Sequence, residues 1–276
     1  MLSPYLRRPG ARPFVVGHRG ALALAPENTL AAFRRAADLG VDAVEFDVQR
    51  TADGVPIIIH DETVDRTTNG HGRVGEMAWA EVRALDAGAW RSPEHAGEHV
   101  PSLGELLGWA RSGSVGLVLE IKQPAPGRGR ARDEGLVASV MDALRSHDLL
   151  ERTLIISFDH PSIAEAIDRE PRARTALLTE VPVLVDPLAP ARAVPGVLGL
   201  HVRWWWISRE LCAAAHEAGM HVHAWGLGQP VDPIAVRRLV DIGVDSLSAD
   251  APDELMAVLR SSGRPTREAG YRDGGA

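Results

Sequence analysis

The chain has 276 residues, a formal net charge of −7 and 45% hydrophobic residues, values typical of an ordinary globular protein with a sizeable core. The acidic balance leaves no broad basic surface, so a general nucleic-acid binder is excluded. The single cysteine, Cys212, excludes an intramolecular disulfide and a cysteine-based zinc site. Because there is neither a signal-like start nor an apolar run of about eighteen residues, we expect a cytoplasmic protein without stable membrane insertion.

Short apolar runs alternate with longer amphipathic segments along the chain. The expected strands are residues 14–18, 43–48, 117–122, 153–158, 174–178, 197–202, 221–225 and 246–250. The clearest helical segments between them are 28–40, 134–150, 208–219 and 232–243. This alternation indicates parallel strands with right-handed crossovers, and about eight such units in about 250 residues predict a TIM barrel. An open doubly wound sheet is the alternative fold, but no G-x-G-x-x-G motif opens a helix.

The first helix has recognisable start and stop signals. Asn28 is the expected N-cap, Leu30 and Phe33 share one face, and Gly40 is the expected stop.

The segment "VEFDVQRTADGVPIIIHDE" predicts two antiparallel strands joined by a turn at Asp53-Gly54. The return strand would bring His60 back beside the first two barrel strands. The polar, glycine-rich residues 61–101 are then expected to be an irregular insertion on the side of the active site. We expect residues 1–262 to form a single domain and residues 263–276 to be a disordered tail.

Two strands carry acidic residues at positions that should be buried. Side chains two residues apart share one face of a strand, so Glu45 and Asp47 point one way while Phe46 points the other. The same parity puts Glu120 and Lys122 on one face. In a barrel, these faces would send the carboxylates inward near the C-terminal ends of both strands.

Buried carboxylates are costly unless something neutralises them. A hard cation with oxygen ligands would do so, and Glu45, Asp47 and Glu120 could supply half of an octahedral shell. A metal-free network in which Arg19 and Lys122 pair with these acids is equally compatible with the spacing.

Two histidines, His18 and His60, are expected at the C-terminal ends of strands. A lone histidine there is usually structural, but two beside carboxylates and cations suit a general acid and base at neutral pH.

Several motifs then occur in a fixed order: "GHRG", "APENTLAAF", "VEFDVQRTADG", "HDETVDRTTNGHG", "LEIK" and "GVDSLSADAP". In this order and spacing they resemble the glycerophosphodiester phosphodiesterase family, over residues 15–252. The resemblance implies a TIM barrel that hydrolyses glycerophosphodiesters to sn-glycerol 3-phosphate and an alcohol.

The resemblance also implies residue roles. His18 and His60 match the catalytic histidines, and Arg19 and Lys122 match the phosphate-binding positions, with Arg19 also counted as catalytic. Glu45, Asp47 and Glu120 match the ligands of one Mg²⁺ or Ca²⁺ ion. Trp225 matches an aromatic residue near the glycerol, while Glu27 and Asp61 are expected to hold their catalytic neighbours. Gly20 is expected to give the backbone room to approach the phosphate.

Three stretches depart from the family pattern or stand outside it. The usual W-T-V-N is "WGLG" here, so Gly226 and Gly228 replace two polar residues, and Ala249 replaces the threonine of T-D-x-P. The run "RWWW", residues 203–206, is either a packing cluster or an apolar lip for a lipid tail.

Strand parity places His221 and His223 on the face of Trp225, toward the lumen. We interpret them as hydrogen-bonded polar residues of the lumen, with a second metal site as the less favoured alternative.

The expected partner is a small glycerophosphodiester, with no nucleic acid and with homo-oligomer formation left open. Two alternative functions remain: a lysophospholipase D or phospholipase C-like enzyme acting on a lipid, and a catalytically silent barrel that binds phosphodiesters.

Overall fold

The computed structural model describes residues 5–124, 131–180, 186 and 188–261; the expected tail at 263–276 lies outside them. The strands are β1 (Phe14–Gly17), β2 (Ala43–Arg50), β3 (Pro56–Ile58), β4 (Gly116–Ile121), β5 (Thr153–Ser157), β6 (Arg174–Thr179), β7 (Gly199–Arg203), β8 (His221–Leu227) and β9 (Ser246–Ala249). The helices are α1 (Leu30–Leu39), α2 (Trp79–Arg83), α3 (Leu103–Ala110), α4 (Leu136–Ser146), α5 (His160–Arg169), α6 (Ala189–Ala193), α7 (Arg209–Glu217), α8 (Pro233–Ile242) and α9 (Pro252–Ser261).

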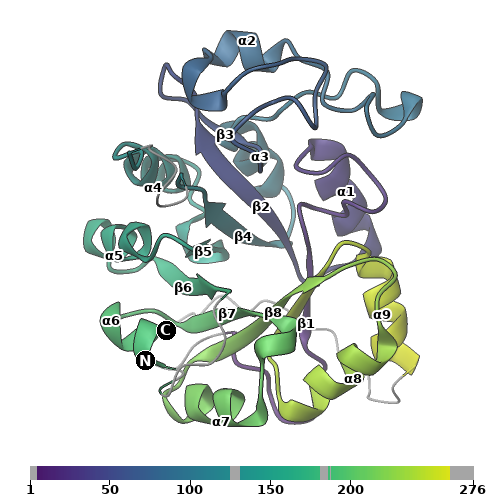
Figure 1. The fold of residues 1–276 in the computed structure, drawn as a ribbon, viewed down its shortest axis with the longest axis vertical. Helices are drawn as coiled ribbons and strands as arrows, with labels where there is room; N and C mark the ends of the chain where they lie inside the picture. Colours follow the sequence, from purple (N-terminus) through teal and green to yellow (C-terminus); the bar gives the residue numbers. More distant parts are fainter. Residues whose placement is uncertain (1–4, 125–130, 181–185, 187, 262–276) are drawn as a thin grey trace.

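The strands form one sheet in the order β1-β9-β8-β7-β6-β5-β4-β2-β3, and β1 also pairs with β2. This last pairing closes every strand except β3 into a parallel barrel, with the helices around its outside (Figure 1). The predicted TIM barrel is therefore confirmed. The strand β3 pairs antiparallel with β2, as the hairpin prediction required.

Alternation along the strands separates two apolar layers. Outward side chains pack under the helices, as where Phe46 of β2 meets Phe33 of α1 with ring centroids 5.9 Å apart. Inward side chains form a second apolar layer inside the barrel, made of Val16, Val118, Leu154, Ile156, Ala176 and Leu178. The acidic residues of β2 and β4 lie level with this layer, because Glu45 is in register with Val118 and Glu120 with Ile156.

The helix α1 begins one residue later than expected. Its N-cap is Thr29, whose side-chain oxygen accepts from the Ala32 amide, so the assignment of Asn28 as the N-cap is wrong. Asn28 instead has a left-handed backbone with φ of 58° and turns its amide side chain toward β2. The predicted stop at Gly40 is confirmed, because Gly40 caps the helix in the left-handed conformation.

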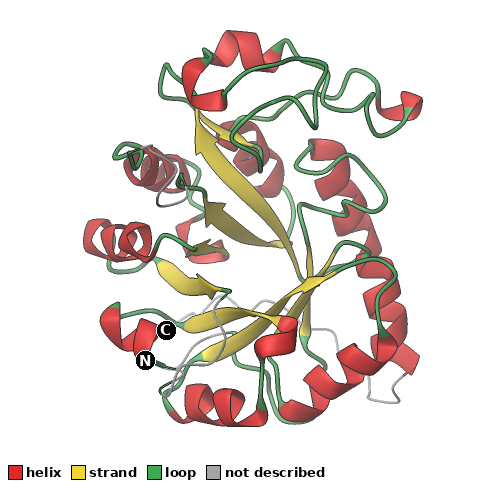
Figure 2. Cartoon of the chain, viewed as in Figure 1, coloured by secondary structure: helices red, strands yellow, loops and turns green. Residues whose placement is uncertain are grey.

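The segment after β3 is loop-rich, and Figure 2 shows it at one end of the sheet. It is less irregular than predicted because it contains the short helix α2. A small apolar cluster supports it, made of Ile57, Ile59, Val64, Val74, Val82, Ala87 and Val100. The insertion therefore has a core of its own, anchored on β3.

Across the described ranges, no helix combines the length and the apolar character needed to cross a lipid bilayer.

Two isoleucines on outer helices allow a matched test of the packing between helix and barrel. Ile163 of α5 is fully buried, whereas Ile234 of α8 is 77% exposed. We expect Ile163→Ala to lower the free energy of unfolding by about 2–5 kcal/mol, because it leaves a cavity under α5. Ile234→Ala should change it by less than about 0.5 kcal/mol. Urea denaturation followed by circular dichroism measures both, and equal effects would contradict this packing.

Candidate active site

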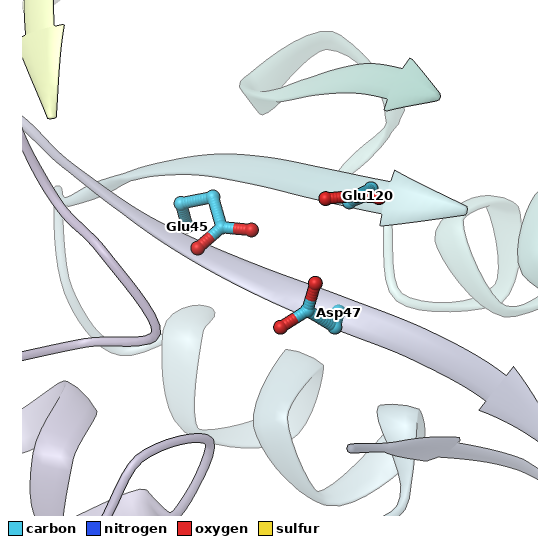
Figure 3. A group of neighbouring side chains, drawn as sticks. All are labelled: Glu45, Asp47 and Glu120. Carbon is cyan, nitrogen blue, oxygen red and sulfur yellow. The ribbon is translucent and has the colours of Figure 1, made fainter. Parts of the chain in front are cut away.

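Three carboxylates meet at the C-terminal ends of β2 and β4. Asp47 and Glu120 are register partners in the parallel pair, and Glu45 lies one inward position before Asp47. Each side chain offers an oxygen within 4.8 Å of the others, and all three residues are buried (Figure 3). The inward orientation predicted from strand parity is what brings these groups together.

The loop after β1 is wound tightly around this acidic group. Arg19 has a left-handed backbone with φ of 47°, and its amide donates to Glu45 Oε2 at 2.9 Å. The Asn28 side chain donates to Asp47 Oδ2 at 2.8 Å. Gly20 has φ of 86°, and a Cβ there would lie 2.7 Å from the backbone of Ala32. In the structure, Gly20 therefore makes room for α1. The expected approach of its backbone to a phosphate stays a prediction.

Two cations lie against the carboxylates. The ammonium group of Lys122 lies 3.0 Å from Glu120 and 3.5 Å from Asp47. The guanidinium of Arg19 lies 3.4 Å from Asp47 and donates to Glu27 at 2.7 Å. All of these side chains are largely buried, so the interactions are screened little by solvent.

Glu27 connects this site to the insertion. Besides the bond from Arg19, its carboxylate accepts from both terminal nitrogens of Arg66 at 2.7 and 2.8 Å. Burial opposes its ionisation, but Arg66 and Arg19 outweigh burial and lower the pKa of Glu27. Arg66 also donates to Asp61, at 2.6 Å. Glu27 thus holds Arg19 in place, as the family resemblance implies.

The two cations do not neutralise three buried acids. Burial and the neighbouring Asp47 charge raise the pKa of Glu45 to about 8. Burial also raises the pKa of Glu120 to about 7, against the opposing effect of Lys122. For Asp47, burial is outweighed by Lys122 and Arg19, so its pKa is lowered. The protein therefore holds Asp47 as a stable carboxylate, whereas Glu45 and Glu120 keep a raised affinity for protons. Oxygen ligands in this state suit a divalent cation.

Each candidate histidine is oriented by its own carboxylate. The Nδ1–H of His18 donates to Asp250 at 2.7 Å, and that of His60 donates to Asp61 at 2.7 Å. This arrangement leaves Nε2 of each ring available, and both histidines line one cavity. Burial lowers the pKa of His18, but Asp250 and Glu45 outweigh burial and raise it overall. Burial lowers the pKa of His60 despite the charge of Asp47. The two rings thus differ in proton affinity.

Two cavities open at this end of the barrel. The smaller, of about 330 Å³, contains both histidines, the acidic residues Glu45 and Glu120, and Trp225. The larger, of about 1480 Å³, runs between the insertion and the segments after β4 and β5. They share His60, Glu120, Lys122 and Phe158, so the two spaces meet beside the carboxylates.

The lumen histidines are hydrogen-bonded, and His201 joins them as a third. His223 contacts Ser246 at 2.7 Å and Ser248 at 3.1 Å, while His201 and His221 contact each other at 3.2 Å. Burial lowers the pKa of His221 to about 4 and that of His223 to about 3, so both are neutral. Among the described residues, only the triad of Glu45, Asp47 and Glu120 has ligand atoms grouped closely enough for a metal.

The three tryptophans at 204–206 differ in burial. Trp204 and Trp206 pack against the hydrophobic core, whereas Trp205 is 44% exposed. Arg203 lies between Trp205 and Trp225, with its Cζ 4.2 and 5.0 Å from the two ring centroids. The run is therefore mainly a packing cluster with one side chain at the rim.

Sequence reasoning missed three residues that hold the site: Asp250, Asn28 and Arg66. For Asp250 a signal existed, because it shares the parity of Ser246 and Ser248 and so faces the lumen at the end of β9. No motif or strand pattern around Arg66 predicted its role, because it reaches the site from the insertion.

Comparisons with known proteins identify the family of this chain. The sequence model of the glycerophosphoryl diester phosphodiesterase family matches residues 18–254. A glycerophosphodiester phosphodiesterase from Caldanaerobacter subterraneus subsp. tengcongensis is 34% identical over 91% of this chain and 100% of its own length. A crystal structure from Silicibacter pomeroyi has a TM-score of 0.84 and 31% identity, covering 95% of this chain and 98% of that one.

An Oleispira antarctica phosphodiesterase in complex with the product sn-glycerol-3-phosphate has a TM-score of 0.80 and 29% identity, covering 90% of this chain and 97% of that one. Because the family match and the relatives span nearly the whole barrel, this chain belongs to the glycerophosphoryl diester phosphodiesterase family.

Proposed function

We propose that this chain hydrolyses glycerophosphodiesters to sn-glycerol 3-phosphate and an alcohol, with the help of one divalent cation, Mg²⁺ or Ca²⁺. The observation that carries the proposal is a buried triad, Glu45, Asp47 and Glu120, flanked by two imidazoles that carboxylates orient. The Oleispira phosphodiesterase, which holds the corresponding product, supports the same substrate class here.

The residues at the barrel mouth suggest how the reaction proceeds. Arg19 and Lys122 would bind the phosphate oxygens and neutralise the charge that they gain in the transition state. A divalent cation on the triad would add Lewis-acid stabilisation of the same charge. Of His18 and His60, one would take the proton from the attacking hydroxyl or water through Nε2, and the other would protonate the leaving alkoxide. Asp250 and Asp61 keep each proton on Nδ1 and so keep Nε2 in the reactive role.

The alternatives have less support. A silent binding barrel does not need two imidazoles, each held by a carboxylate at 2.7 Å. A lipid-acting enzyme needs an apolar path for the acyl chain, but Trp204 and Trp206 are used in packing. Arg203 also brings a charge to the rim beside Trp205 and Trp225. A small polar substrate suits this mouth better.

The first prediction concerns substrate and metal. We expect release of sn-glycerol 3-phosphate from glycerophosphocholine and glycerophosphoethanolamine, loss of that activity in EDTA, and its return with Mg²⁺ or Ca²⁺. Lysophosphatidylcholine, assayed by choline release, should be turned over more slowly. Full activity in EDTA would refute metal dependence, and faster turnover of the lysolipid would favour the lipid-acting alternative.

The second prediction concerns the two imidazoles. His18→Ala and His60→Ala should each lower kcat by at least about 100-fold, because each removes a proton-transfer group. The control is His71→Ala, because the His71 side chain is 88% exposed and pairs with Asp65 on the surface of the insertion. It should leave kcat unchanged. Near-normal turnover by either active-site variant would remove that histidine from the mechanism.

The third prediction follows from the raised pKa values of Glu45 and Glu120. Without metal, the folded state keeps protons that the unfolded state releases between about pH 4.5 and pH 8, so its free energy of unfolding falls as pH rises through that window. A divalent cation displaces these protons, so its stabilising effect should be larger at about pH 8 than at about pH 5.

Thermal melting in EDTA and in excess Mg²⁺ or Ca²⁺ measures this dependence. Glu45→Gln and Glu120→Gln should flatten the pH slope and reduce the metal-induced shift in Tm. Glu94→Gln, an exposed change in the insertion, should alter neither. A metal shift that is equal at both pH values, or that survives in the Glu45 variant, would argue against the triad as the ligand set.

A further inference from the structure

The two cavities divide the space available to a diester into a confined part and an open part. They meet at His60, Glu120, Lys122 and Phe158, beside the triad where the phosphate would bind. A phosphodiester bound there must direct one ester arm into each cavity. At about 330 Å³, the smaller is near the lower end of ordinary ligand pockets, whereas the larger, at about 1480 Å³, exceeds their usual range.

Substrates of this class share the glycerol and differ in the second alcohol. A confined pocket suits the constant arm, and an open groove tolerates the variable one. The smaller cavity also has an aromatic wall, formed by Trp225 and Phe158 with ring centroids 5.6 Å apart. The glycerol therefore belongs in the smaller cavity, where its hydroxyl groups need polar partners.

Most polar groups of that cavity are already engaged with the protein. The Trp225 indole N–H donates to the carbonyl of His201 at 3.2 Å. His223 is bonded to Ser246 and Ser248, and His18 is bonded to Asp250. These groups therefore offer no unused donor to a bound alcohol.

Arg203 is different. Its Nε is buried and has no hydrogen-bond partner among the described residues. The other cavity-lining atom of this kind, Nε of Arg19, faces Asp47 at 3.4 Å. The Nη1 of Arg203 donates to Glu180, a largely exposed group, so the guanidinium is held at the rim while its Nε–H remains unused. Leaving a buried donor unpaired is costly unless a ligand completes it.

The unusual "WGLG" stretch leaves the space that the Arg203 side chain occupies. The strand β8 is irregular between Ala224 and Leu227, and Gly226 has φ of 86°, where a threonine would be strained. A Cβ on Gly226 would lie 3.7 Å from both Cγ and Nε of Arg203, so the arginine stem passes directly over this glycine. The polar side chain missing at 226 is thus replaced in space by the guanidinium of Arg203, from the neighbouring strand β7.

We propose that Arg203 is a specificity-determining residue that binds the terminal hydroxyl of the substrate's glycerol, in the role that Gly226 and Gly228 cannot fill. This inference rests on the proposed phosphodiesterase activity and adds to it a named donor for the constant arm of the substrate. Stacking between Trp205 and Trp225 holds the guanidinium plane in position, so little freedom is lost when the hydroxyl binds.

Two substrates that differ only in the hydroxymethyl group that carries this hydroxyl test the proposal. The first is glycerophosphocholine, and the second is 2-hydroxyethyl phosphocholine, which keeps the neighbouring hydroxyl but lacks the terminal hydroxymethyl group. Choline release measures kcat/KM for both with one assay. The wild-type protein should prefer the glycerol substrate by at least about ten-fold, since a hydrogen bond from a charged donor is at stake.

Arg203→Met keeps the length of the stem and removes the donor. It should lower that preference about ten-fold, with the loss falling on the glycerol substrate. The matched control is Arg238→Met. Arg238 supports the same tryptophan run, donating to the carbonyls of Trp204 and Ile207, but it does not line the cavity. The Arg238→Met variant should prefer the glycerol substrate as strongly as the wild type does.

The outcomes are separable. If the wild type hydrolyses neither substrate, the proposed function fails. If it is active but Arg203→Met retains the wild-type preference at an unchanged Tm, the role of Arg203 is overturned while the function stands. If Arg203→Met melts early, Arg203→Gln replaces it in the same comparison. An equal fall in preference in Arg238→Met would also overturn the inference, because the effect would then come from packing.

Discussion

The structure of the site depends on one electrostatic imbalance. Glu45, Asp47 and Glu120 are buried together within 4.8 Å, and within the part of the chain that the structure describes only two cationic side chains, Arg19 and Lys122, form ion pairs with them. Because isolated buried charge is expensive, such an arrangement persists only if a further cation completes it or if protons remain on two of the acids. This imbalance is the physical basis of our proposal that a divalent cation binds at the triad and helps to bind a phosphodiester.

The barrel creates this imbalance by simple geometry. Parallel register puts Asp47 beside Glu120, and alternation turns both away from the apolar outer layer that contains Phe46. Inward apolar side chains lie beside these acids, with Val118 in register with Glu45 and Ile156 in register with Glu120. The charged groups and the apolar lining therefore share the same part of the lumen, near the C-terminal ends of the strands.

Much of this was predictable from the sequence, and the failures are instructive. Parity along the strands was sufficient to turn Glu45, Asp47 and Glu120 inward, because an alternating pattern leaves no other face for them. Asn28 was misassigned because an N-cap residue and an asparagine that holds a buried carboxylate can both stand just before a helix in the sequence. Only the left-handed backbone at Asn28 distinguishes the two. The meeting of Arg203 with Gly226 could not be predicted, since it depends on the irregular pairing of β8 with β9.

The position of Glu27 between two arginines affects more than the site itself. One carboxylate joins Arg19, on the loop after β1, to Arg66, in the insertion, through bonds of 2.7 to 2.8 Å. The insertion is thereby tied to the group that would grip the phosphate, although it has its own apolar core. The insertion therefore cannot be exchanged between barrels as an independent module. A replacement segment without an equivalent of Arg66 would leave Glu27 paired with Arg19 alone. The chimaera would then have an incompletely neutralised carboxylate near the substrate, even if the barrel and the insertion both folded correctly.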